Sequence, residues 1–140
     1  MPLQLFQLAD REKIKVEYFD FTSPVMGLYW VAGDMPPLVG LDKSLVNNTP
    51  LLRTVFAEEL GHHFTSAGTC IPKEFYNYTN RLTISKAEYK ALKWAANYLI
   101  PENDFLDALR DGLYEPWEFA EFFNVTEDLV KFRLQLFTAN

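Results

Sequence analysis

The order of the hydrophobic patterns constrains the fold of this chain more than any other feature of its sequence. Three short segments near the N-terminus are typical of strands: residues 14–21, 27–33 and 36–42. From about residue 50 onward the apolar residues recur at helical spacing instead. Strands followed by helices predict an α+β fold, with a small antiparallel or mixed sheet at the N-terminal end. Pro36 and Pro37 predict that the third strand is short or lies at an edge.

The first long helical pattern covers residues 50–65. Thr49 as N-cap and Pro50 at the first helical position predict where this helix begins. Residues 68–84 show no steady period and are predicted to form a connecting loop. Ser85 is expected to cap a second helix, which ends before Pro101. The predicted helices after the first are residues 86–99, 103–110, 116–123 and 126–138.

Length and composition narrow the class of protein. The 140 residues fit one domain, 1–140, and 49% of them are hydrophobic, enough for a folded core. A net charge of −6 with scattered Lys and Arg argues against direct binding to nucleic acid or to an anionic membrane. A single cysteine, Cys70, excludes an internal disulfide and fits a reducing compartment. We therefore expect a soluble, cytoplasmic protein with no membrane span.

Ionisable residues of the segment "FAEELGHHFT" point toward the predicted core. At 100° per residue, Glu59 and His63 lie inside the apolar arc of the helix, and Glu58 and His62 lie along its edge. Ionised groups near a core are costly unless they are paired, protonated or bound to a cation. The arc itself is expected to face the core and contains Leu52, Val55, Phe56, Leu60 and Phe64; the opposite side contains Thr54, Ala57, Gly61 and Thr65.

The second helix repeats this arrangement with one acidic residue. Glu88 lies in the middle of its apolar stripe, next to Ala91 and Ala95, whose small side chains would let another helix approach closely. The predicted solvent-facing residues are Lys90, Lys93 and Asn97. An inward carboxylate on this helix, together with the inward carboxylates and histidines of the first helix, suggests a metal ion that joins the two. A buried Glu–His pair, or a hydrogen-bonded network without metal, is the alternative explanation.

Two segments resemble the ImmA/IrrE family of metallopeptidases, found in phages, mobile elements and stress-response regulators. "LRTVFAEELGHHFT" is similar to the family's active-site helix, usually A-H-E-L-G-H-H, and "EYKALKWAANYLIP" is similar to its downstream E-x-x-A-x-x-F/W-A segment. The resemblance covers nearly the whole chain. It implies a zincin-like minimal metallopeptidase: a small sheet, an active-site helix, a second helix that supplies a ligand, and a helical C-terminal part.

The resemblance also implies roles for individual residues. His62 matches the second histidine ligand, Glu88 the third ligand and Glu59 the catalytic glutamate, whereas Glu58 stands where the first histidine is expected. Glutamate can ligate zinc through oxygen, and one helical turn still places Glu58 beside His62. We therefore expect Glu58, His62 and Glu88 to bind metal. His63 is expected to support the site or to face the substrate.

The implied activity is cleavage, inside the cell, of a helix-turn-helix repressor of a prophage or mobile element, which would regulate transcription by relieving repression. The cofactor is a divalent metal: zinc is expected, and the oxygen-rich ligand set makes manganese or iron the alternatives. The alternative function is a catalytically weakened or inactive peptidase fold that regulates its repressor by binding alone. Tyr29, Tyr76 and Tyr78 are candidates to stabilise the oxyanion. The tail "FAEFFNVTEDLVKFRL" resembles a helix-turn-helix, but its acidic residues oppose phosphate binding.

Overall fold

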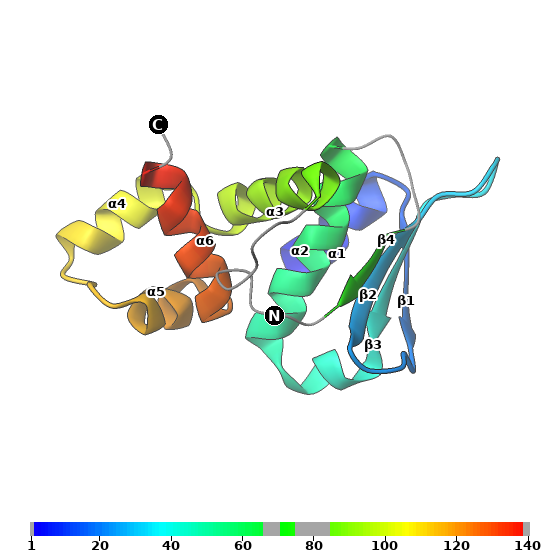
Figure 1. Cartoon of the computed structure of the whole chain (residues 1–140), viewed down its shortest axis with the longest axis horizontal. Coiled ribbons are helices and arrows are strands. Elements are labelled where there is room, and N and C mark those ends of the chain that lie inside the picture. The colour runs from blue at the N-terminus through cyan, green and yellow to red at the C-terminus, as the bar shows by residue number, and fades with distance from the viewer. Residues whose placement is uncertain (1, 66–70, 75–84, 139–140) are drawn as a thin grey trace.

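The computed structural model describes residues 2–65, 71–74 and 85–138. Its sheet has the strand order β1-β3-β2-β4, and β1 is parallel to β3, while β2 is antiparallel to both β3 and β4. This is the mixed sheet of the predicted α+β fold (Figure 1). The strands are β1 (Lys15–Phe19), β2 (Val25–Trp30), β3 (Leu38–Asp42) and β4 (Ile71–Glu74).

The sheet differs from the sequence expectation in one strand, β4. β3 is short, as predicted, and lies between β1 and β2. Pro36 and Pro37 precede its first residue, so neither interrupts its hydrogen bonds. The predicted loop 68–84 contains β4, whose backbone pairs with β2. The other residues of that predicted loop, 68–70 and 75–84, lie outside the described residues.

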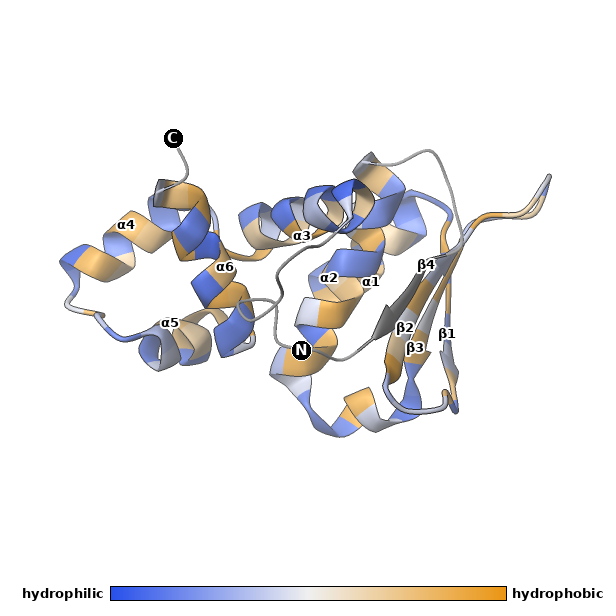
Figure 2. Ribbon diagram, in the orientation of Figure 1, coloured by the Kyte–Doolittle hydropathy of each residue, from blue (hydrophilic) through white to orange (hydrophobic). Residues whose placement is uncertain are grey.

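Helix α2 (Thr49–Thr65) lies at the centre of the fold, across the sheet and against α1 (Leu3–Arg11) (Figure 1). Asn48 takes the capping role predicted for Thr49, because its Oδ1 accepts a hydrogen bond from the Leu51 amide at 3.3 Å. Figure 2 shows hydrophobic residues concentrated on β2 and β3, with polar and apolar residues mixed along α2. A central helix of mixed polarity is unusual, and it marks α2 as the place to look for a site.

Helix α3 (Lys86–Leu99) packs on the side of α2 that the sequence pattern assigned away from the core. Thr54, Ala57 and Gly61 are therefore buried, which corrects the single-stripe prediction for α2. Phe64, predicted to be in the core, is instead 39% exposed and stacks on Trp94 at 4.9 Å. The prediction for α3 is confirmed: Ser85 caps it, and its predicted solvent-facing residues Lys90, Lys93 and Asn97 are exposed.

The helical C-terminal part matches the predicted boundaries closely and packs against α2 and α3. Arg133 donates from Nε to the Ile100 carbonyl at 2.8 Å, and the Thr126 amide donates to Thr54 Oγ1 at 3.2 Å. None of the helices in the described ranges combines the length and apolar character needed to cross a bilayer. The three helices are α4 (Glu102–Arg110), α5 (Pro116–Phe123) and α6 (Glu127–Thr138).

Candidate functional site

Three ionisable residues of α2 are buried, and two others, Arg53 and His63, are partly buried. Glu58 and Glu59 are 0% exposed, and His62 is 1% exposed. They occupy the second half of α2, between the sheet on one side and α3 on the other. Side chains of this kind are rarely buried completely in a protein core without a functional or structural reason, since removing their charges from water costs several kcal/mol.

Glu88 reaches the α2 cluster from α3. Its Oε1 lies 3.9 Å from His62 Nε2, and the Glu88 side chain is 12% exposed. Two ligand atoms bound to one zinc ion, each at about 2.0–2.2 Å, can be at most about 4.4 Å apart. The separation of His62 and Glu88 is therefore compatible with ligation of a common ion. The Ser85 cap contributes, because its Oγ accepts a hydrogen bond from the Glu88 amide and fixes the start of α3.

Gly61 and Ala91 allow α2 and α3 to come this close. A Cβ atom added at Gly61 would lie 2.4 Å from the Ala91 carbonyl oxygen, well inside any permitted contact. The absence of a side chain at Gly61 lets the two backbones touch, and the adjacent His62 can then face Glu88. Ala91, one of the two small residues of α3 predicted to allow a close helix contact, has this role in the structure.

Glu59 faces the sheet, where Gly27 of β2 leaves space for it. A Cβ atom at Gly27 would lie 2.9 Å from Glu59 Oε2 and 2.8 Å from Val55 Cγ1. The carboxylate of Glu59 is therefore held between α2 and the backbone of β2. Gly27 was not predicted to matter from the sequence, because a strand glycine next to a buried carboxylate leaves no local pattern.

Replacing Gly27 with alanine tests this packing. We expect Gly27→Ala to lower the free energy of unfolding by about 1–3 kcal/mol, because the new methyl group overlaps both Val55 and Glu59. The penalty should be smaller in a Val55→Ala background, where one of the two overlaps is gone. Urea unfolding of the four variants of this cycle measures the coupling. An equal penalty in both backgrounds would show that Val55 does not contact position 27.

His63 belongs to a separate network on the sheet side of α2. Tyr29 Oη lies 2.8 Å from its Nδ1, and Glu12 Oε1 lies 3.1 Å from its Nε2. Burial raises the pKa of Tyr29, so its hydroxyl keeps its proton and can donate to Nδ1 while Nε2–H donates to Glu12. The hydroxyl of Tyr29, a candidate oxyanion donor, is thus hydrogen-bonded to His63. Tyr76 and Tyr78, the other candidates, and Cys70 lie outside the described residues.

Comparison of the sequence with a protein-family model identifies the family of this chain. The model of the IrrE N-terminal-like domain, of peptidase family M78, matches residues 9–135. The chain belongs to this family. Its fold is accordingly of the metallopeptidase type, as the two helical motifs suggested. No curated protein matches the chain significantly.

The structure brings together some of the residues predicted to bind metal in this IrrE N-terminal-like domain. His62 and Glu88 approach each other, and Glu58 is buried one helical turn before His62. In the part of the chain that the structure describes, no three His, Cys, Asp or Glu side chains are grouped as a metal site. The donor types, one imidazole and two carboxylates, nevertheless suit a divalent cation.

Proposed function

We propose that this IrrE N-terminal-like domain is a metal-dependent endopeptidase, in which Glu58, His62 and Glu88 hold a divalent cation and Glu59 is the general base. The observation that carries the proposal is the approach of His62 to Glu88, 3.9 Å apart, across a helix contact that Gly61 makes possible. Family membership supports the peptidase class. Zinc is the expected metal, and the oxygen-rich donor set makes manganese and iron the alternatives.

In the proposed peptide hydrolysis, the cation and the side chains of the protein would have different roles. When bound, a divalent cation would polarise the peptide carbonyl and acidify an attacking water. Glu59 would take the proton of that water and later return it to the leaving amine. The confinement of Glu59 between α2 and the Gly27 backbone favours this role, since it limits the positions that the carboxylate can take.

The proposed substrate is a helix-turn-helix repressor inside the cell, whose cleavage would relieve repression of a prophage or mobile element. This part of the proposal is supported by the resemblance of the α2 and α3 motifs to ImmA/IrrE peptidases. The scattered cations and the net charge of −6 favour a protein substrate over nucleic acid.

Metal content tests the ligand assignment directly. The protein purified without chelator should contain about one equivalent of metal, and Glu88→Ala should lower the affinity at least about tenfold by removing a ligand. Glu121→Ala, the same change at an exposed glutamate of α5, is the matched control and should bind metal normally. Elemental analysis and a competition titration give both values. Unchanged metal binding by Glu88→Ala would contradict the proposed ligand set.

The alternative is a peptidase fold that regulates its repressor by contact alone. Two observations favour it: Glu58 replaces the first histidine of the motif, and the described residues contain no three-residue metal group. In that case the purified protein would be folded and metal-free, and it would bind the repressor without cleaving it. Co-purification followed by mass spectrometry of the repressor separates the two functions.

A further inference from the structure

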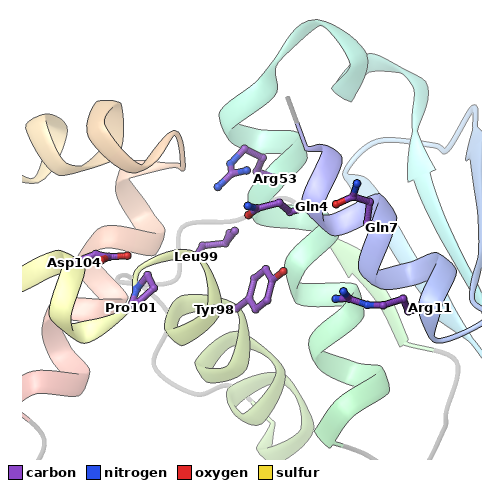
Figure 3. A pocket seen from close by; sticks show the side chains of 8 residues that line it. All are labelled: Gln4, Gln7, Arg11, Arg53, Tyr98, Leu99, Pro101 and Asp104. Carbon is purple, nitrogen blue, oxygen red and sulfur yellow. The ribbon is translucent and has the colours of Figure 1, made fainter.

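A polar pocket of about 470 Å³ lies between α1, α2, α3 and the start of α4 (Figure 3). Arg53, which lines it, precedes His62 by nine residues, and at 100° per residue the two side chains leave opposite faces of the helix. The volume falls in the range of small-molecule sites. The polar lining residues come from four helices and are Gln4, Gln7, Arg11, Arg53, Tyr98 and Asp104.

Arg53 is held in place by the C-terminal end of α5. Its Nε donates to the Asn124 carbonyl at 3.0 Å, and its Nη2 donates to the Phe123 carbonyl at 3.4 Å. Within the described ranges, these hydrogen bonds use two of its five N–H donors. Burial lowers the pKa of Arg53, yet an arginine of this kind keeps its charge at neutral pH. Among the residues described, no carboxylate forms an ion pair with it, so a partly desolvated positive charge borders the pocket.

Tyr98 is the second preorganised group of the lining. Its ring stacks on Trp94 with the centroids 5.0 Å apart and the planes 9° apart, and Trp94 stacks in turn on Phe64. Figure 3 shows the Tyr98 hydroxyl directed toward α1, where Gln7 and Arg11 lie. The stacking fixes the ring, so the hydroxyl can donate to a ligand at little cost in conformational entropy.

The charge of the lining indicates what it would bind. Two guanidinium groups, two amides and a phenol face one carboxylate, Asp104, which lies at the α4 end of the pocket. The pocket lining thus has more cationic and neutral hydrogen-bond donors than carboxylates, whereas the chain as a whole has a net charge of −6. Arginine recognises carboxylate and phosphate groups through paired hydrogen bonds.

We propose that this pocket binds a small organic anion, whose phosphate or carboxylate group is held by Arg11 and Arg53 and accepts a hydrogen bond from Tyr98. The site is separate from the proposed peptidase centre, because it uses the opposite face of α2. Its occupancy can therefore be measured without metal and without a peptide substrate.

Titration with two probe anions tests the proposal. Inorganic phosphate and citrate are added to the isotope-labelled full chain at constant ionic strength, and the arginine Nε–Hε and Tyr98 resonances are followed. We expect saturable shifts of Arg53 and Arg11. Arg11→Ala should weaken binding about tenfold through loss of a charge-assisted bond, and Tyr98→Phe should weaken it several-fold while keeping the ring stack. Both substitutions avoid the carbonyl contacts of Arg53, so the fold should persist.

Arg110→Ala is the matched control, since this exposed arginine lies at the other end of α4 and pairs with Asp107. It should bind the probes as the unmodified chain does. A preference for phosphate would identify a phosphorylated ligand, and a preference for citrate would identify a carboxylate ligand. Absence of saturable binding, or binding that is equally strong in Arg11→Ala and Tyr98→Phe, would overturn the proposal.

Discussion

Glu59→Gln should slow cleavage of the cognate repressor by about 10²- to 10⁴-fold while leaving metal affinity unchanged. Glutamine has the shape of glutamate, so it fits the space between α2 and Gly27, but it cannot accept the proton of the attacking water. Glu59 is 0% exposed, and solvent cannot easily substitute for the lost base. Single-turnover cleavage of purified repressor, followed by gel electrophoresis, measures the rate.

The matched control for this experiment is Glu121→Gln, the same chemical change at an exposed position of α5. It should cleave at the unmodified rate. Circular dichroism and a metal titration of Glu59→Gln separate loss of the base from loss of the fold or of the metal. Cleavage by Glu59→Gln at the rate of the control would remove Glu59 from the mechanism.

Gly61→Ala should lower the free energy of unfolding by about 2–3 kcal/mol, although alanine is the better helix former. The added methyl group would lie 2.4 Å from the Ala91 carbonyl oxygen, and this backbone atom cannot turn away as a flexible side chain could. α3 must therefore shift as a unit. Because Glu88 lies on α3, the same shift should separate it from His62 and weaken metal binding.

Chemical denaturation measures the first effect of Gly61→Ala, and a metal titration measures the second. Gly33→Asn is a suitable control, because nothing lies near its Cβ position and asparagine tolerates its φ of +53°. The control should change stability by less than about 0.5 kcal/mol. A Gly61→Ala protein as stable as the unmodified chain would show that the contact between α2 and α3 is looser than described.

Sequence reasoning found the elements that have strong local signals. Ser85 predicts the start of α3 correctly, and the apolar spacing predicts all three C-terminal helices to within a residue or two. The sequence pattern does not predict α1, because its N-cap residue, Pro2, has no side chain that can cap a helix. β4 was missed because it contains Pro72 and depends on pairing with β2, a contact far away in the sequence.

The site shows the same division between local and long-range information. Helical angles place Glu59 inside the apolar arc and His62 along its edge, because a helix has a regular period, and the structure buries both. His63, which the same angles place inside the arc, keeps 19% of its side chain exposed. They could not show that Gly61 meets Ala91, since a helix surrounded on several sides has no single buried stripe. The hydrogen bond between His63 and Glu12 was equally inaccessible, because it requires α1, which the pattern did not predict.

The position of α2 has a consequence for synthesis of the chain. The strands that cover one side of α2 precede it or follow it closely, but α3 begins only at Lys86 and α6 only at Glu127. Until these later segments have been synthesised, α3 and α6 cannot cover α2. We therefore expect Glu58 and His62 to be removed from water late in folding, after the N-terminal sheet can already pair.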